Sequence, residues 1–386
     1  MSGAAAALDA RVLAAVRRRL AEDGGEPEAL AVADLVRAEA PCPLSSSAVL
    51  AAVGTLQAEL SGAGPLEPLL ADPEVTDVLV NAGGEVWVDR GHGLVRSAVR
   101  FGDEGQVRRL AVRLAARCGR RLDDAAPWVD ARLPGGVRLH AVVPPVAVGG
   151  THLSLRVLRQ QHRSLDELVE DGSVDPGAAE LLHSLVAARA SFLVTGGTGS
   201  GKTTLLACLL GLVPDDERLV VAEDTTELAP RHPHALSLEG RPSNAEGRGA
   251  VPLRELVRQA LRMRPDRLVV GEVRGAEVVE LLAALNTGHE GSCGTLHARS
   301  PGAVPARIAA LAAPAGMDAA ATASQLLAGL DAVVHVERTR EGRRVSSLGV
   351  LEPDAAGGCT VSTAWTPAGR GPGWPRLAAL LERQGT

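Results

Sequence analysis

The fold of this chain is decided by the stretch SFLVTGGTGSGKTTLLACLLGL, residues 191–212. Its apolar start, its glycines and its leucine-rich end predict a strand, a loop and a helix in that order. Glycines let backbone N–H groups turn inward without a Cβ in the way, and the following helix adds its positive end at the same place. The stretch therefore predicts a phosphate-binding loop for a nucleoside triphosphate.

Different residues of this loop are expected to have different roles. Lys202 should reach the β- and γ-phosphates, and the hydroxyl of Thr203 should ligate Mg²⁺. Lys202 is the only lysine in 386 residues, so the other 39 of the 40 basic residues are arginine. A compact ammonium fits inside a phosphate loop where a planar guanidinium does not. The residues expected to bind the nucleotide are Gly196, Gly197, Thr198, Gly199, Ser200, Gly201, Lys202, Thr203 and Thr204.

Composition argues against several classes of protein. A hydrophobic share of 46% and a charged share of 22% are typical of a globular chain, and 386 residues suggest two or three domains. An aromatic share of 2% and a net charge of −6 argue against a protein that coats nucleic acid. Five scattered cysteines without a CxxC pair favour a reducing compartment and no zinc site. Since no apolar run approaches about 18 residues, we expect a cytoplasmic protein that meets a membrane only through partners.

The chain is predicted to contain five segments. Residues 1–62 carry apolar residues at helical spacing. Residues 63–157 alternate short β-rich segments with glycine turns around one helix, which indicates a small α+β domain, and the polar residues 158–175 look like a linker. Residues 176–352 alternate strands and helices as in a parallel α/β domain, whereas residues 353–386 are rich in Gly, Pro and Ala and are expected to form a loose tail.

Two acidic stretches follow predicted strands of the α/β domain. Arg218–Ala222 leads into Glu223–Glu227, and Leu268–Gly271 leads into Glu272. Carboxylates at the C-terminal ends of parallel strands lie where α/β sheets place their chemistry, although a simple acidic turn would show the same spacing. Glycine stands at 271 where an aspartate is usual, so Glu272 either joins the Mg²⁺ shell or polarises the attacking water.

A third stretch, residues 287–297, places His289 and His297 eight positions apart in a glycine-rich segment. Its His, Glu and Cys residues match no standard zinc pattern. A lone histidine is more often structural, whereas two histidines in this context could read the state of the γ-phosphate. A phosphate loop alone would allow a kinase, a GTPase or a transporter subunit, and these later stretches narrow the choice.

Together, the three stretches resemble the acidic box, the atypical second Walker motif and the histidine box of the type II/type IV secretion ATPases. The matching residues are Glu223–Glu227, Arg262–Gly275 and Asn286–His297. The Tad/Flp pilus branch is the most similar, and the conjugation ATPases come next. The resemblance extends from Gly64 to Val336, and it implies a RecA-like P-loop ATPase domain of the α/β class. A small α+β (PAS-like) domain and a helical N-terminal segment would precede it.

The resemblance also implies the roles of individual residues. ATP and Mg²⁺ are the expected substrate and cofactor, with Glu227 activating the water and with Glu272 and Thr203 on the metal side. Arginines of the N-terminal domain should reach the phosphates. The residues expected to act in catalysis are therefore Lys202, Glu227, Glu272, His289, His297, Arg132, Arg138 and Arg156.

The family forms homo-hexameric rings that work with an inner-membrane platform protein of a pilus or secretion apparatus. The resemblance therefore implies a cytoplasmic ring at the inner face of the membrane, which hydrolyses ATP with Mg²⁺ to power pilus assembly or type II/IV secretion. Two other hypotheses stay open. One is a conjugation ATPase that assists transfer of DNA or nucleoprotein, and the other is a nucleotide-binding scaffold with little turnover.

Overall fold

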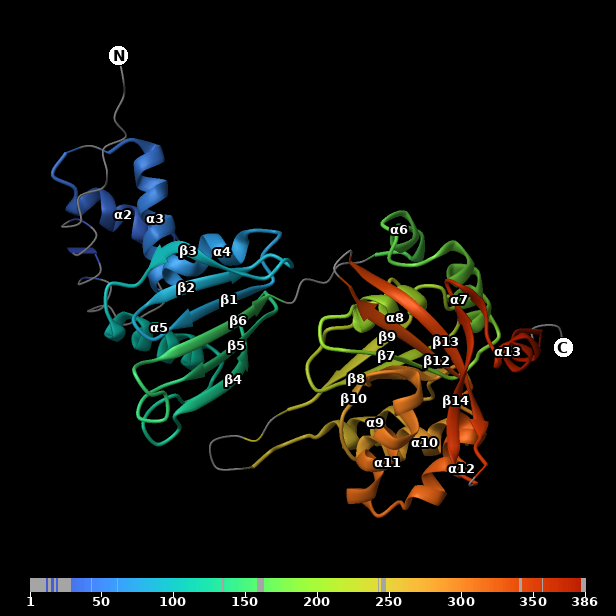
Figure 1. The fold of residues 1–386 in the computed structure, drawn as a ribbon. Coiled ribbons are helices and arrows are strands. Elements are labelled where there is room, and N and C mark those ends of the chain that lie inside the picture. The colour runs from blue at the N-terminus through green and yellow to red at the C-terminus, as the bar shows by residue number, and fades with distance from the viewer. Residues whose placement is uncertain are drawn as a thin grey trace. The chain divides into compact units, whose positions relative to one another are not determined.

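The computed structural model divides into two compact units, Met1–Arg159 and Gln160–Thr386 (Figure 1). Most of residues 1–28, which are predicted to be helical, lie outside the described residues. The structure describes residues 12, 15, 16, 19, 29–42, 44–60, 62–133, 135–157, 163–241, 243, 248–339, 342–355 and 357–382.

The first unit contains two helices of the predicted helical segment, α2 (Ala29–Glu39) and α3 (Ser46–Leu60). Apolar side chains of both helices share a buried cluster with Val12 and Val16. The short helices η1 (Gly64–Leu66) and α4 (Glu67–Ala71) then lead into a sheet.

This sheet has six strands in the order β3-β2-β1-β6-β5-β4, and every neighbouring pair is antiparallel. Alternate strand residues share a buried cluster with the apolar side of α5, so the sheet has an apolar and a polar face. The elements are β1 Asp77–Asn81, β2 Glu85–Asp89, β3 Leu94–Arg100, α5 Glu104–Arg117, β4 Trp128–Arg132, β5 Val137–Val142 and β6 His152–Val157.

The second unit contains a nine-stranded sheet in the order β15-β14-β13-β12-β7-β11-β10-β8-β9. The six neighbouring strands β12, β7, β11, β10, β8 and β9 are parallel to one another. Strands β13, β14 and β15 extend the sheet beyond β12 with antiparallel pairing. The continuous apolar runs of β7, β8 and β10 are buried on both faces, as expected for central parallel strands. The strands are β7 Phe192–Gly196, β8 Leu219–Glu223, β9 Ala235–Glu239, β10 Arg267–Val273, β11 Cys293–His297, β12 Ala332–Arg338, β13 Arg343–Pro353, β14 Cys359–Thr366 and β15 Gly369–Arg370.

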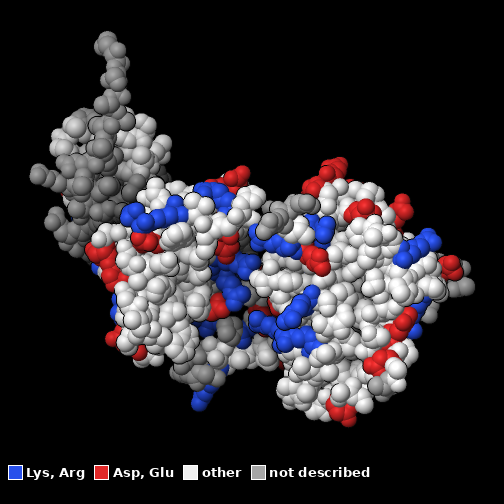
Figure 2. Space-filling model, viewed as in Figure 1, with Lys and Arg blue, Asp and Glu red and all other residues white. Residues whose placement is uncertain are grey.

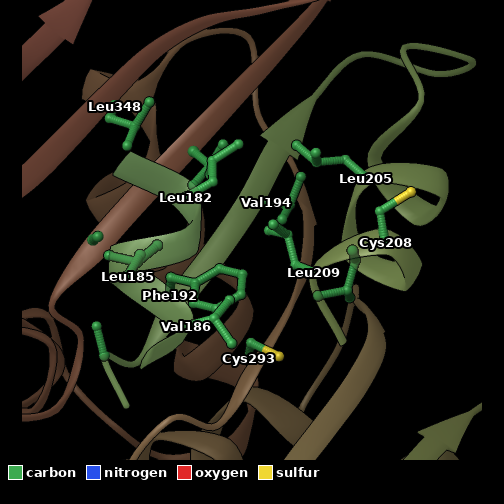
Figure 3. Packing of buried hydrophobic residues seen from close by; sticks show 14 of the residues in the cluster. Leu182, Leu185, Val186, Phe192, Val194, Leu205, Cys208, Leu209, Cys293 and Leu348 are labelled. Atoms are coloured by element: carbon green, nitrogen blue, oxygen red, sulfur yellow. The ribbon is translucent and has the colours of Figure 1, made fainter. Parts of the chain in front are cut away.

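Helices cover both faces of this sheet (Figure 1). Successive side chains of β7 point to opposite faces, so Phe192 and Val194 join one core and Leu193 joins the other. Figure 3 shows Phe192 and Val194 among residues of the first core. The first core includes residues of α6 Leu165–Glu170, α7 Pro176–Ala187, α8 Lys202–Leu210 and α13 Trp374–Leu381. The second includes residues of α9 Leu253–Leu261, α10 Glu277–Leu285, α11 Val304–Ala312 and α12 Ala319–Gly329, and the short helices η2 Pro301–Ala303 and η3 Ala313–Ala315 flank α11.

Two segments that were expected to lie outside the domains instead contribute to the first of these cores. The expected linker 158–175 contains α6, and Leu165 and Leu168 are buried with the residues of α7 and α8. The expected loose tail 353–386 forms β14, β15 and α13, which bury Leu377 completely. Composition misled in both cases because a few apolar residues among polar or glycine-rich neighbours are enough to anchor a segment when a sheet edge or a core is available.

Candidate functional site

Most of the predicted residues of the second unit, all except His289, lie at the carboxyl ends of four neighbouring parallel strands, β7, β11, β10 and β8. The strand register places Gly196 of β7 beside His297 of β11, and Val270 of β10 beside Ala222 of β8. The loop after β7, His297, and the acids that follow β8 and β10 therefore leave the sheet at one edge. Open α/β sheets bind their ligands at this edge.

The loop between β7 and α8 has a shape that requires glycine. Gly196 has a φ of +152°, and a Cβ there would lie 2.2 Å from the carbonyl oxygen of Val336. Gly201 has a φ of +98° at the N-cap of α8. Both values lie in the region that side chains disfavour. The Ser200 hydroxyl donates to the Gly197 carbonyl at 3.0 Å and closes the loop into a compact turn.

Lys202 is buried at the start of α8, with 6% of its surface exposed. Its Nζ donates to the carbonyl oxygen of Gly197 at 2.8 Å and lies 3.4 Å from Nδ1 of His297. Burial lowers the pKa of Lys202, and the nearby charges of Glu272 and Glu227 partly offset this by raising it. An ammonium that is partly removed from water in this way binds an anion more strongly than an exposed one.

His297 bridges Lys202 and Glu272. Its Nε2 lies 3.2 Å from Oε1 of Glu272, while its Nδ1 faces Lys202. Burial lowers the pKa of His297, and the charge of Lys202 lowers it further, whereas Glu272 raises it. A neutral ring with its proton on Nε2 satisfies both neighbours, because it donates to Glu272 and accepts from Lys202. The structure thus places His297 beside the loop, between Lys202 and Glu272.

Glu223 ends β8 and is 4% exposed. Its Oε1 accepts the backbone N–H groups of Glu227 and Leu228, each at 3.1 Å. Burial raises the pKa of Glu223 to about 7, although these two hydrogen bonds lower it. The side chain fills the space over Gly271, where a Cβ would lie 2.4 Å from Cγ of Glu223. A side chain at position 271 would therefore collide with this buried glutamate.

The remaining predicted acids have oxygen atoms available for other partners. Glu227 is exposed beyond β8, and Glu272 at the end of β10 has 43% of its side chain exposed. Thr203 follows Lys202 in the first turn of α8. Hydroxyl and carboxylate oxygens suit Mg²⁺, which keeps several waters and takes other ligands from phosphates. Thr203 and Glu272 fit that pattern. Within the described ranges no cluster of three or more His, Cys, Asp or Glu side chains could hold a metal on its own.

His289 does not join the other residues within one chain. It precedes β11, whereas His297 ends that strand, so the length of β11, about 13 Å from its first residue to its last, lies between them. The carbonyl of His289 accepts the Ser292 hydroxyl at 2.7 Å, and the Ser292 oxygen accepts the N–H of Leu268 at the amino-terminal part of β10. The expectation that both histidines face one phosphate is therefore wrong for a single chain, because the strand between them spans the sheet.

Arg132, Arg138 and Arg156 belong to the first unit and form one row across β4, β5 and β6. Arg132 is paired with Arg138, and Arg138 with Arg156, in the strand register. Directly opposed residues lie about 5 Å apart and point to the same face of a sheet, here the polar face. Asp130 bonds to Arg138 at 2.8 Å, and Asp77 lies 4.0 Å from Arg156. On the face drawn in Figure 2, basic side chains form patches on both units.

Sequence reasoning missed two features of the site. The burial of Glu223 depends on Gly271, which lies on a different strand, so the acidic stretch alone does not reveal it. Arg343 of β13 donates from Nε to the carbonyl oxygen of Gly199 at 3.0 Å, from 144 positions further along the chain. Arg343 is the first residue of its strand in a polar stretch, and no local pattern separates it from the other arginines of this sequence.

A family model described as type II/IV secretion system protein matches residues 59–351. The chain is 59% identical over 329 residues to a putative conjugal transfer protein of Mycobacterium tuberculosis, covering 83% of this chain and 93% of that protein. It is 32% identical over 287 residues to the conjugal transfer protein TrbB of Rhizobium radiobacter, covering 72% of this chain and 84% of the relative. It is also 36% identical over 261 residues to the type IV secretion system protein PtlH of Bordetella pertussis, covering 61% and 76%.

Solved structures share the fold. The pilus retraction motor PilT with bound ADP has a TM-score of 0.51 at 22% identity, covering 77% of this chain and 80% of that one. The ATPase DotB of Legionella pneumophila has a TM-score of 0.50 at 18% identity, covering 79% and 78%. None of the helices in the described parts of the chain has the length and apolar character needed to span a membrane.

Proposed function

Because this chain belongs to the type II/IV secretion system protein family and is a motor ATPase, we propose that it hydrolyses ATP with Mg²⁺ to power pilus assembly or type II/IV secretion at the inner membrane. One observation carries the proposal. Lys202 is buried in a glycine-shaped phosphate loop, and His297, Glu272 and Glu227 lie around its ammonium.

In the proposed reaction, water attacks the γ-phosphorus in line with the departing ADP. Lys202 neutralises charge on the β- and γ-phosphates, and Glu227 orients the water and takes its proton. Thr203 and Glu272 would hold Mg²⁺, which would help to neutralise the charge of the phosphates. His297 contacts both Lys202 and Glu272, so its ring joins the phosphate side of the site to the proposed metal side.

A second kind of cation comes from the α+β domain of residues 63–157. The loop segment from Gly196 to Thr204 has Lys202 as its only cation, and charge that develops on the γ-phosphate is typically stabilised by a guanidinium. We propose that the row of Arg132, Arg138 and Arg156 serves this purpose for the site of its own chain. ATP then closes the two domains together, and hydrolysis releases them.

The motor is proposed to work as a homo-hexameric ring in the cytoplasm, held at the inner membrane by a platform protein of the apparatus. Conjugal transfer of DNA or nucleoprotein is the second candidate function. It is favoured by the names of two relatives, the conjugal transfer proteins of Mycobacterium tuberculosis and Rhizobium radiobacter. A nucleotide-binding scaffold is disfavoured because Lys202, Thr203, Glu227 and Glu272 are all present.

Phosphate release and nucleotide binding by the full chain test the proposal. Lys202→Ala should lose most ATP binding, because the phosphates lose their buried cation. Glu227→Gln should still bind ATP and turn over about 10²- to 10⁴-fold more slowly, the usual effect of removing a general base. Glu290→Gln is the matched control, since Glu290 is exposed near the opposite edge of the sheet. Near-normal turnover in Glu227→Gln would assign its role to another acid. Wild-type protein that binds ATP without Mg²⁺-dependent release would favour the scaffold.

A further inference from the structure

The hairpin formed by β12 and β13 stands directly beside the phosphate loop. Strand β12 is the parallel neighbour of β7, and Val336 lies beside Gly196, where the loop begins. Two residues further on, Arg338 is paired with Arg343 at the end of the hairpin. The N–H of Thr339 donates to the Gly342 carbonyl at 2.7 Å and closes this end. The end of the hairpin therefore places Arg338 and Arg343 beside the phosphate loop.

Arg343 makes contact with the loop at two glycines. Its Nε donates to the carbonyl oxygen of Gly199 at 3.0 Å. Its aliphatic part lies against Gly201, where a Cβ would be 3.2 Å from Cδ of Arg343. Both glycines have positive φ, +69° at Gly199 and +98° at Gly201. The guanidinium thus bonds to a carbonyl in the left-handed part of the loop, where the backbone of any other residue type would resist the turn.

Within the described residues, the nearby charges that act on Arg343 are positive. Among the residues that the structure describes, no carboxylate forms an ion pair with it, and its Nε donates to the neutral carbonyl of Gly199. Burial lowers the pKa of Arg343, and the positive charges of Arg338 and Arg163 lower it further. Arg163 has its own partner, because its guanidinium bonds to Asp171 at 2.6 Å. Arg343 and Arg338 both lie beside Gly199 of the loop. An anion bound in the loop would therefore reduce the repulsion between these two guanidinium groups.

We propose that Arg343 is a positioning residue that holds the phosphate loop in its anion-binding shape from the β12–β13 hairpin. The inference rests on the proposed role of the loop in nucleotide binding. By bonding to the outward carbonyl of Gly199, Arg343 keeps the flanking N–H groups turned inward before ATP arrives. It does not contact the reacting atoms. Its loss therefore weakens binding of the ground state and the transition state alike.

The test compares Arg343→Gln, Arg343→Lys and the control Arg344→Gln, with KM and kcat for ATP measured separately in the full chain. Arg344 is the next residue of the same strand, so its side chain leaves on the opposite face. Arg343→Gln should raise KM by about 10-fold with kcat little changed, the pattern expected when uniform binding is lost. Arg343→Lys should stay close to Arg343→Gln, because lysine keeps the charge but has no guanidinium Nε to donate to Gly199. Arg344→Gln should resemble the wild type.

Three outcomes would overturn the inference: an unchanged KM in Arg343→Gln, full restoration of KM by lysine, or a lowered kcat with KM unchanged. The second would mean that charge alone acts, and the third that Arg343 acts on the transition state. Equal thermal unfolding midpoints of Arg343→Gln and the wild type without nucleotide exclude a folding defect. If Arg343→Gln unfolds at a lower temperature than the wild type, the dissociation constants of ADP and adenosine are compared in both proteins. Arg343→Gln should weaken binding of ADP but not of adenosine, because only ADP has phosphates that contact the loop. Lys202→Ala tests the proposed nucleotide site separately from the role of Arg343. Unchanged ATP binding in that variant would refute the nucleotide site itself.

Discussion

Replacing Gly271 by alanine tests the central packing feature of the site. Gly271 lies within β10, and its φ is not positive, so the backbone accepts alanine and only space opposes it. The added Cβ would lie 2.4 Å from Cγ and 2.8 Å from Oε1 of Glu223. Overpacking of this kind costs about 1–3 kcal/mol. If Glu223 moves to relieve it, the N–H groups of Glu227 and Leu228 lose their acceptor, which costs a further amount of about 1–3 kcal/mol.

We therefore expect Gly271→Ala to lower the free energy of unfolding by about 2–6 kcal/mol. Urea titrations of the intact protein, followed by circular dichroism, measure this change. Turnover should fall by about 10²-fold as well, because a displaced Glu223 releases the backbone that positions Glu227. The matched control is Gly302→Ala, where nothing lies within 4 Å of the added Cβ. That variant should remain within about 0.5 kcal/mol of the wild type.

A double-mutant cycle with Glu223→Ala decides whether the two residues compete for one space. Without the Glu223 side chain, the methyl group at 271 meets no obstacle. The double variant should then be more stable than the sum of the single effects by about 1–3 kcal/mol. Additive effects within about 0.5 kcal/mol would falsify the interpretation. So would a Gly271→Ala variant that is as stable as Gly302→Ala.

The other predictions concern pH and the arginine row. Burial raises the pKa of Glu223 from 4.5 to about 7, so between these values the folded protein keeps a proton that the unfolded chain has lost. The free energy of unfolding should therefore fall as pH rises from about 4.5 to about 7. In Glu223→Gln the unfolding midpoint should fall less over this range. Equal slopes of midpoint against pH in the variant and the wild type would contradict this. Arg132→Ala or Arg156→Ala should retain nucleotide binding and lose turnover, and mixing either with Lys202→Ala subunits should restore no activity. Recovery of phosphate release on mixing would show that the arginines act across subunits.

Several features of this protein follow from local sequence alone. The phosphate loop could be predicted because positive φ values and close approach leave glycine as the only choice at positions such as Gly196 and Gly201, and because Lys202 is the single lysine. Strands β7, β8 and β10 could be predicted because a strand buried on both faces must be apolar throughout. The family could be recognised because its acidic and histidine boxes are contiguous stretches.

Tertiary structure alone decided which of these residues meet. The polar segment before α7 and the glycine-rich tail belong to the core because long-range pairing and packing, rather than composition, hold α6, β14 and α13. His289 and His297 look equivalent in the sequence, yet a strand of the parallel sheet places them at opposite edges. Arg343 reaches Gly199 only because β12 is the neighbour of β7. Strand order in a sheet is set by contacts between distant residues, and no local pattern encodes it.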